Sequence, residues 1–290
     1  MVNLEKTREN WKNSRMCELF AVSSQHRVSL TYSLNEFARH GGLSHLNKSG
    51  WGMSFQQNSD TLLIKEAKPA FDSPWVRFVA EQETSSHCIL AHVRYATTGD
   101  AVYEDTHPFK REAWGTAHVF AHNGDLHRFH DALSLTNSHF QPLGQTDSEH
   151  AFCYLMEQLV PVWQKGMPSL EERLQKIGAT ADCLRTLGSS NFIYSDGDAL
   201  FIHADLRRYD DTGVFGPRRS PALHYIERRN LHVDGLKLRP SENRESRTLI
   251  FASVPLTDDD WQPLPRGSLL AIKGGGIAAR LDLGPGDWQE

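Results

Sequence analysis

The order in which strand-like and helix-like stretches follow one another constrains the fold of this chain more than any other feature. Runs of apolar and β-branched residues with the length of strands form a first group at residues 18–23, 52–56, 61–64, 89–95 and 116–122. A second group follows at residues 192–195, 200–204, 222–227, 249–253 and 268–272. Two long stretches with helical spacing separate the groups. This order predicts a layered α+β fold in which two antiparallel sheets pack face to face and helices cover their outer faces.

The expected helices have recognisable ends. A helix over residues 34–40 is terminated by Gly41-Gly42, and another covers residues 75–82. A long helix begins after Thr146, its expected N-cap, with Glu149 three residues on, and a second long helix follows Pro168. The segment Ser195-Asp196-Gly197-Asp198 predicts a hairpin turn. No linker interrupts the pattern, so we expect one domain over residues 17–290, preceded by a leader of residues 1–16.

Composition excludes several classes of function. The net charge of -5 gives no basic excess of the kind that binds nucleic acid, and no apolar run approaches the roughly 20 residues needed to cross a bilayer. The 15 histidines lack the spacing of zinc sites, so we expect no metal or other cofactor. The cysteines, which lack paired spacing, are Cys17, Cys88, Cys153 and Cys183. Reduced thiols, and therefore a cytoplasmic protein, fit this pattern.

Cys17 is the candidate nucleophile. If it is the first residue of the mature chain, it carries both a thiol and a free α-amine whose pKa is about 8, close to the pH at which a general base works best. Translation from Met16, or trimming of the leader, exposes that amine. The leader has neither the apolar stretch nor the cleavage site of a secretory signal. The alternative is a buried cysteine that opens the first strand.

Four local patterns downstream supply groups that complement a thiol nucleophile. Arg94 offers a two-pronged contact to a carboxylate, with a surface ion pair as its structural alternative. The side chain of Asn123 and the backbone N–H of Gly124 are a suitable oxyanion pair, although Asn-Gly is also a common turn, and glycine permits an unusual backbone there. Asp147 either binds an α-ammonium group or caps a helix. His107 lies in a rigid turn, where it orders a pocket or merely packs.

One basic region stands apart from these patterns. Residues 205–247 contain Arg207-Arg208, Arg218-Arg219 and Arg228-Arg229 among interspersed acidic residues. A solvated loop and an exposed hairpin are the main interpretation. A loop that faces an anionic substrate or partner is the alternative.

Seven short motifs lie along nearly the whole chain after Met16, and their order along the chain is informative. They are Met16-Cys17-Glu18-Leu19, Gly50-Trp51-Gly52, His92-Val93-Arg94, Thr106-His107-Pro108-Phe109, His122-Asn123-Gly124, Gly144-Gln145-Thr146-Asp147-Ser148-Glu149, and Ala252 with Pro255-Leu256-Thr257. In this order they resemble the class II (N-terminal nucleophile) glutamine amidotransferases, most closely the small stand-alone group. The chain departs from that pattern at Ser49, Asp105 and Val254, where aspartate, asparagine and glutamate are frequent, and in its leader.

The resemblance implies a fold and a set of roles. The fold is a four-layer αββα sandwich of the Ntn hydrolase type. Cys17 is the nucleophile, Asn123 and Gly124 form the oxyanion hole, and Arg94 and Asp147 anchor the substrate. From its place in the turn, we expect His107 to be a further substrate-binding residue. The implied activity is hydrolysis of the side-chain amide of glutamine or a γ-glutamyl compound through a Cys17 thioester, with glutamate and ammonia or an amine as products.

Three functions remain open from the sequence. The chain is a glutaminase that hands ammonia to a separate synthetase or acceptor subunit, or a stand-alone γ-glutamyl amide hydrolase acting on a larger metabolite. The third is a non-catalytic γ-glutamyl binding module, which applies if Cys17 never becomes N-terminal.

Overall fold

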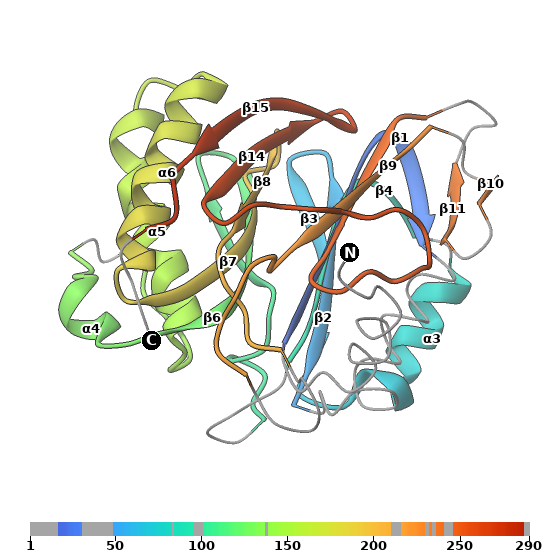
Figure 1. The fold of residues 1–290 in the computed structure, drawn as a ribbon, viewed down its shortest axis with the longest axis horizontal. Coiled ribbons are helices and arrows are strands. Elements are labelled where there is room, and N and C mark those ends of the chain that lie inside the picture. Colours follow the sequence, from blue (N-terminus) through green and yellow to red (C-terminus); the bar gives the residue numbers. More distant parts are fainter. Residues whose placement is uncertain are drawn as a thin grey trace.

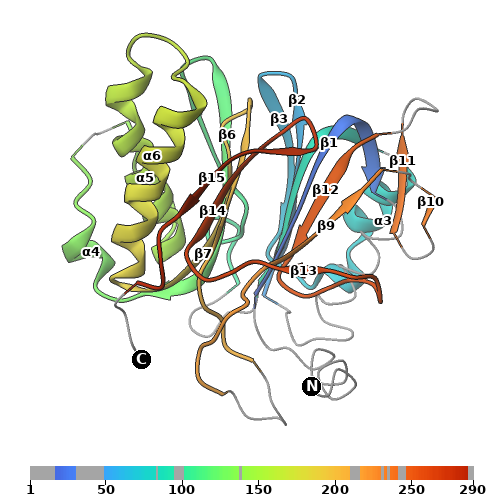
Figure 2. The ribbon, with the colours of Figure 1, turned by 45° about the horizontal axis from the view of Figure 1, so that its top comes forward.

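Two antiparallel sheets lie face to face, with helices on their outer sides (Figures 1 and 2). The computed structural model describes residues 17–30, 49–82, 84–94, 101–136, 139–209, 216–229, 232–233, 236–240 and 246–286. The expected leader and the expected helix over residues 34–40 with Gly41-Gly42 lie outside these residues. Figure 2 shows α5 and α6 on the outer face of one sheet and α3 on the outer face of the other. The predicted α+β sandwich of four αββα layers is confirmed.

The first sheet contains β1 at its centre. Its hydrogen-bonded order is β13 (Gln262–Pro263), β9 (His224–Arg228), β12 (Thr248–Ala252), β1 (Glu18–Leu30), β4 (Ser85–Val93), β2 (Trp51–Gln57) and β3 (Asp60–Glu66). Off this path, β11 (Leu236–Pro240) pairs with β1 and with β10 (His232–Val233).

The second sheet contains β8 and β7 at its centre. Its order is β15 (Gly276–Asp282), β14 (Ser268–Lys273), β8 (Leu200–Ala204), β7 (Gly188–Ser195), β6 (Thr116–Leu126) and β5 (Phe109–Ala113). The predicted hairpin turn between β7 and β8 is confirmed, with the Asp196 N–H donating to the Ala199 carbonyl. The predictions missed β5 and β15, the two edge strands, and ended β6 four residues early.

Helices begin close to the three predicted starts that lie within the described residues, as α3 (Pro74–Glu81), α5 (Asp147–Trp163) and α6 (Leu170–Arg185). Two short helices, η2 (Ala70–Asp72) and α4 (Phe129–Ala132), were not predicted. Thr146 caps α5 by accepting the Glu149 N–H, as expected. At the start of α6, Ser169 and Glu172 form a reciprocal capping box.

Three apolar layers hold the sandwich together. The layer between the sheets includes Leu19 and Ala21 of β1, Leu90 of β4 and Ala121 of β6. A second layer lies under α5 and α6, and a third lies between the first sheet and α3. Because successive side chains of a strand point to opposite faces, membership of a layer fixes the face on which every second residue lies.

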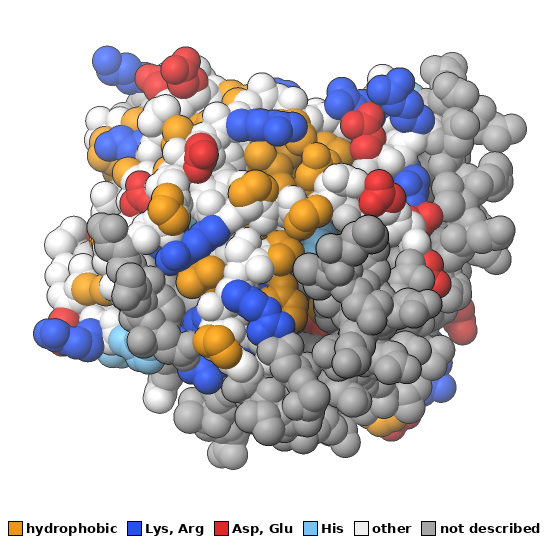
Figure 3. All heavy atoms as spheres, viewed as in Figure 1, with side chains coloured by type: hydrophobic (Ala, Val, Ile, Leu, Met, Phe, Trp, Pro, Cys, Tyr) orange, Lys and Arg blue, Asp and Glu red, His pale blue; other side chains and the backbone are white. Residues whose placement is uncertain are grey.

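The described part of the chain shows neither a membrane-spanning helix nor a cluster of metal ligands. None of its helices is both long and apolar enough to span a bilayer. Lys and Arg side chains intermingle with Asp and Glu side chains on the face seen in Figure 3. Within the described ranges, no three His, Cys, Asp or Glu side chains are grouped so that they could hold a metal ion.

Candidate active site at the start of β1

The pairing of β1 with β4 places Cys17 opposite Arg94. Glu18 pairs with Val93 and Leu19 with His92, so one further step along both strands sets Cys17 across from Arg94. Leu19 and Leu90 lie in the layer between the sheets. By strand alternation, Cys17 and Arg94 lie on that same inner side. The half-buried Cys17 therefore opens the central strand at the end of the space between the sheets.

Asn123 approaches Cys17 from the opposite sheet. It lies on β6 two residues after Ala121 and so faces the same inner space. Its Nδ2 donates a hydrogen bond of 2.5 Å to the backbone carbonyl of Cys17. An amide nitrogen carries two N–H groups, so this bond fixes the side chain and leaves the second N–H for another acceptor. The structure thus brings Asn123, Cys17 and Arg94 to one place.

Gly124 has a different structural role from the one expected. It lies inside β6 rather than at a turn, and a Cβ on it would lie 1.9 Å from the Ser189 carbonyl oxygen. Close approach of the neighbouring strand, and not an unusual backbone conformation, therefore requires glycine here.

The Gly124 N–H points away from β7. Gly124 pairs with Ser190, whose own N–H is directed to Asp205 Oδ2 on the β8 side at 3.2 Å. In an antiparallel ladder this makes Gly124 and Ser190 a non-hydrogen-bonded pair. On the other side of β6, pairing with β5 ends at Phe109 and Phe120. The Gly124 N–H is thus directed past the end of β5, beside the Asn123 side chain.

Arg94 is buried with part of its guanidinium group unsatisfied. Its backbone N–H donates to the Gly50 carbonyl at 2.8 Å, and its carbonyl accepts from Ser49 at 3.1 Å. The side chain is only 8% exposed, and Nη1 has no hydrogen-bond partner among the described residues. A buried unpaired guanidinium nitrogen is costly, so a ligand carboxylate is a suitable partner.

His107 packs against His92, two residues before Arg94. The ring centroids are 4.2 Å apart, and neither ring has a hydrogen bond to the part of the chain that is described. Burial lowers the pKa of His92 to about 3 and, with the neighbouring His92 adding to the effect, lowers the pKa of His107 well below its usual value. The pair is therefore neutral and adds no charge beside Arg94. The expected placement of His107 in the pocket wall fits this packing, while its contact with substrate stays a prediction.

Asp147 lies between β6 and α5. Its Oδ2 accepts the Leu126 N–H at 2.8 Å, and its Oδ1 accepts the Ser148 N–H at 2.7 Å. The carboxylate therefore performs the capping role and also ties the helix start to the strand that carries Asn123. Oδ1 also accepts from Ser148 Oγ at 3.2 Å, whereas Oδ2 keeps a second lone pair for a ligand ammonium group.

The loop that precedes Asp147 is held by two acidic groups, the buried Glu149 and the partly exposed Asp105. Glu149 accepts the N–H groups of Leu143 and Gly144 and forms an ion pair of 2.6 Å with Arg111. Asp105 Oδ1 accepts the Gln145 N–H at 2.9 Å. An asparagine at position 105 has the same acceptor atom, which explains why aspartate is tolerated in its place.

Ser253 was not predicted from the sequence, and Arg207 was named only as one member of an arginine-rich segment. Ser253 lies beside Leu19, accepting the Leu19 N–H on its Oγ at 3.0 Å and donating its own N–H to the Leu19 carbonyl at 2.9 Å. Arg207, also buried, donates from Nη1 to the Ser253 carbonyl at 2.8 Å. Neither residue has a sequence signal of its own, because both roles arise from pairing between distant segments.

The arginine-rich segment reaches the same end of the sandwich. Arg218 forms an ion pair of 2.5 Å with Asp125, the residue after Gly124. Arg207 and Arg219 are joined by a β-bridge, and their guanidinium groups lie 5.4 and 4.4 Å from the centre of the Tyr209 ring. Part of the segment is thus an organised wall near Asn123 and not simply a solvated loop. The predicted strand at residues 222–227 is confirmed as β9.

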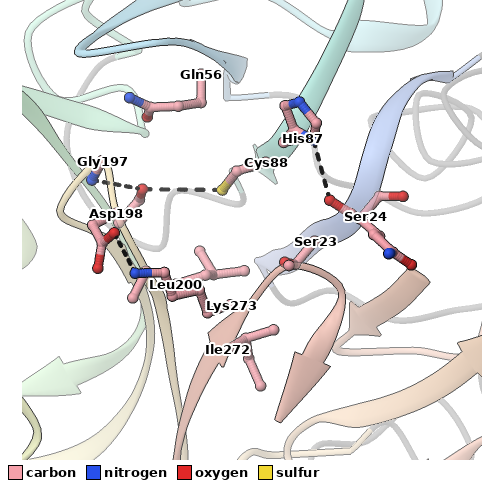
Figure 4. Close-up of a pocket in the computed structure, with 14 residues that line it drawn as sticks. Ser23, Ser24, Gln56, His87, Cys88, Gly197, Asp198, Leu200, Ile272 and Lys273 are labelled. Atoms are coloured by element: carbon pink, nitrogen blue, oxygen red, sulfur yellow. Dashed lines mark hydrogen bonds and ion pairs between the residues drawn. The ribbon is translucent and has the colours of Figure 1, made fainter. Parts of the chain in front are cut away.

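A cavity of about 260 Å³ lies elsewhere between the sheets and has a lining that resembles a thiol site (Figure 4). It is lined by Cys88, His87 and Ser195. It lies further along β1 than Cys17, at the level where Cys88 pairs with Ser23. Burial raises the pKa of the Cys88 thiol to about 12, and its Sγ lies 4.0 Å from Ser195 Oγ. His87 contacts the Ser24 carbonyl and not the thiol. Cys88 therefore lacks both an activating base and a favourable environment.

Comparison with known proteins decides the family. Residues 16–284 match the sequence pattern of the glutamine amidotransferases class-II. The chain belongs to this family. Its sequence is 35% identical over 254 residues to "Putative glutamine amidotransferase YafJ" of Escherichia coli (strain K12), covering 87% of this chain and 95% of that protein.

Solved structures of glutamine amidotransferases share the fold. A "predicted glutamine amidotransferase" from Pseudomonas aeruginosa superposes with a TM-score of 0.66 at 25% identity, over 91% of this chain and 100% of that one. The glutamine phosphoribosylpyrophosphate amidotransferase of B. subtilis has a TM-score of 0.59 at 17% identity, over 92% of this chain and 49% of that one. The two-sheet body of this amidotransferase domain is therefore common to both.

Proposed function

We propose that this amidotransferase domain hydrolyses the side-chain amide of glutamine or of a γ-glutamyl compound, with Cys17 as the nucleophile. The observation that carries the proposal is the bond from Asn123 Nδ2 to the Cys17 carbonyl, with Arg94 opposite Cys17 in the same register. Strands β1, β6 and β4 thereby hold the nucleophile Cys17, the oxyanion donor Asn123 and the carboxylate-binding Arg94, respectively.

The reaction divides into two steps. The Cys17 α-amine accepts the thiol proton, the sulfur attacks the amide carbon, and the new oxyanion is stabilised by the second N–H of Asn123 and the N–H of Gly124. Each such donor contributes about 3 kcal/mol to transition-state stabilisation. The α-ammonium then protonates the leaving ammonia or amine, which departs as the γ-glutamyl thioester forms. Water, deprotonated by the same amine, hydrolyses the thioester and releases glutamate and the thiol.

The α-amine of Cys17 takes part only if residues 1–16 are absent from the active chain. The family match begins at Met16, which supports an active domain that starts at Cys17. Removal of methionine before a small residue such as cysteine then exposes the amine. Reduced cysteines fit a cytoplasmic location for this chemistry.

The glutamyl head is held at its two charged groups. Arg94 receives the α-carboxylate, since its buried Nη1 otherwise has no partner in the described part of the chain. Asp147 receives the α-ammonium group on the second lone pair of Oδ2, since Oδ1 accepts from both the N–H and the hydroxyl of Ser148. The neutral His92 and His107 pair forms the wall next to Arg94.

A second candidate function is favoured by the arginine-rich wall. Arg218 pairs with Asp125 beside the site, and Arg207 and Arg219 are bridged to each other in the same segment. Such a wall suits a γ-glutamyl compound whose leaving group carries a carboxylate or phosphate, as in a stand-alone hydrolase. Free glutamine, whose leaving group is ammonia, gains nothing from it. Transfer of ammonia to a separate acceptor subunit remains compatible with the first candidate.

Two measurements test these functions. Intact mass of the protein purified from its own cells gives the mature N-terminus, and incubation with the glutamine analogue 6-diazo-5-oxo-norleucine gives the adduct and its site. We expect a chain that begins at Cys17 and one adduct on its sulfur. An active chain that retains residues 1–16 contradicts the mechanism, and a retained leader with no turnover supports the non-catalytic binding module instead.

Substrate choice needs a separate comparison. Release of ammonia from glutamine is measured against hydrolysis of γ-glutamylglutamate and γ-glutamylethylamide, with and without any co-purifying protein. Preference for the anionic dipeptide, lost in Arg219→Met, supports the hydrolase. Release of ammonia that rises with a partner supports the glutaminase subunit.

A further inference from the structure

Asn191 is a buried side chain of β7 whose polar groups are all engaged. It is 2% exposed, and it pairs with Asn123 across β6 and β7. Its Nδ2 donates to the Asn123 carbonyl at 3.0 Å and to the Leu206 carbonyl at 2.7 Å. Its Oδ1 accepts the Asp205 N–H at 2.6 Å. This one amide therefore connects the residue that contacts Cys17 with the chain leaving β8.

The anchor at the far end of this connection is rigid. Asp205 is buried, and its Oδ1 lies 2.9 Å from Arg266 Nε and 3.4 Å from Arg185 Nε. Its Oδ2 accepts the Ser190 N–H. A buried carboxylate held by two guanidinium groups has little freedom to move, so it fixes the backbone to which Asn191 is bonded.

Asn123 needs such support because β6 lacks a neighbour on one side there. Pairing with β5 ends at Phe120, three residues before Asn123, whereas pairing with β7 continues to Leu126. Among the described strands, therefore, β7 alone pairs with the backbone of Asn123 and Gly124. The Asn191 amide adds a bond to the Asn123 carbonyl on that side.

We propose that Asn191 is a positioning residue for the oxyanion site, acting through Asn123. This inference rests on the proposed role of Asn123. By fixing the Asn123 backbone, Asn191 sets the direction in which the Asn123 amide meets both the Cys17 carbonyl and the substrate oxygen. Oxyanion stabilisation depends steeply on the placement of its donors, whereas binding of the glutamyl head by Arg94 does not involve this connection.

The test is a double-mutant cycle on kcat for glutamine, or for the best γ-glutamyl substrate. The variants are Asn123→Ala, Asn191→Ala and the combination of both. We expect Asn191→Ala to lower kcat roughly 10-fold with KM within a factor of about 2, and to have little further effect once Asn123 is alanine. A purely structural role predicts multiplication of the two effects instead.

Two controls separate positioning from damage. Ser190→Ala removes a neighbouring buried hydroxyl that has no partner among the described residues, and we expect it to retain full kcat. Asn191→Asp keeps the acceptor for the Asp205 N–H but loses both donors. It replaces Asn191→Ala in the double-mutant cycle if the alanine variant unfolds. Alkylation of Cys17 by iodoacetamide should proceed at the wild-type rate in all folded variants, because the thiol itself is unchanged.

The outcomes distinguish the inference from the proposed function. If Asn123→Ala keeps its full kcat, the oxyanion role of Asn123 is wrong, and the role of Asn191 is wrong with it. If Asn123→Ala loses kcat but Asn191 variants keep theirs, or lose it multiplicatively, only the positioning role is overturned.

Discussion

Leu126 donates its backbone N–H to Oδ2 of Asp147 at 2.8 Å, and this bond joins the end of β6 to the start of α5. The Asp147 carboxylate is therefore set by the same strand that carries Asn123 and Gly124. On the proposed function, one strand thus aligns the groups that hold the α-ammonium group and the reacting amide of the substrate.

Asp147→Asn tests the binding part of this arrangement. The change removes the negative charge and keeps one oxygen for the Ser148 N–H, which preserves the helix start, while the Leu126 N–H loses its acceptor. We expect KM for glutamine to rise about 10-fold, since a lost charge contact of about 1.4 kcal/mol corresponds to that factor, with kcat nearly unchanged. Kinetics at pH 7 check it. Glu171→Gln, in the exposed first turn of α6, is the matched control and should leave KM unaltered.

Gly124→Ala tests whether space or backbone conformation requires glycine in the Asn-Gly pair. A Cβ there lies 1.9 Å from the Ser189 carbonyl oxygen, so β6 and β7 must separate. We expect a protein that is insoluble or has a greatly lowered Tm. Gly115→Ala is the comparison, because its φ of +77° is strained but nothing lies within 4 Å, so about 1 kcal/mol is expected. Equal losses of stability in the two variants argue against the spatial explanation.

The sequence predicted the central strands and the site residues better than the edges. Runs such as residues 192–195 and 249–253 are apolar because they are buried on both faces. The missed strands β5 and β15 are the edges of their sheet, where charged residues such as Lys110, Arg111 and Arg280 interrupt any apolar pattern. The end of β6 was also missed, since Asn123-Gly124 has the composition of a turn.

The residues of the candidate site likewise fall into those that the sequence predicted and those that it did not. Cys17, Arg94 and Asn123 belong to local motifs, and the register of β1 with β4 and the bond to Cys17 bring them together. Asn191 and Ser253 have no such motif. Their roles come from contacts with residues far away in the sequence, which one sequence alone does not reveal.

Arg94→Lys tests the predicted carboxylate contact. Lysine keeps the charge but loses the planar fork that donates two parallel hydrogen bonds. We expect KM for glutamine to rise by a factor of about 10 to 100, from a loss of about 1.4 to 2.8 kcal/mol, with a smaller effect on kcat. The control is Arg77→Lys, on α3, where the arginine side chain is 67% exposed. A KM that stays at the wild-type value removes Arg94 from the binding site.

Differential alkylation tests which thiol is the nucleophile. Burial raises the pKa of Cys88 to about 12 and that of Cys153 to about 11, so both are almost entirely protonated at pH 8. We expect iodoacetamide to modify Cys17 well before either of them, with loss of activity in step with that modification. Peptide mass spectrometry measures the order. Inactivation that follows modification of Cys88 instead assigns the chemistry to the other end of the sandwich.

Buried histidines make the free energy of unfolding of this protein depend on pH. His203 lies in the second sheet, where its Nδ1 donates to the Ser268 carbonyl at 3.1 Å, and burial lowers its pKa to about 4 from 6.5. Between these values the unfolded chain binds a proton that the folded chain does not, so folding is favoured above pH 6.5 and weakens as the pH falls towards 4. The slope for one such group is about 1.4 kcal/mol per pH unit. His203→Leu should therefore lower the slope of the unfolding free energy against pH between pH 4 and 6.5. The largest expected decrease corresponds to one proton, or about 1.4 kcal/mol per pH unit. Urea unfolding at pH 4.5, 5.5 and 6.5 measures the slope, and an unchanged slope in the variant shows that His203 is protonated in the folded state.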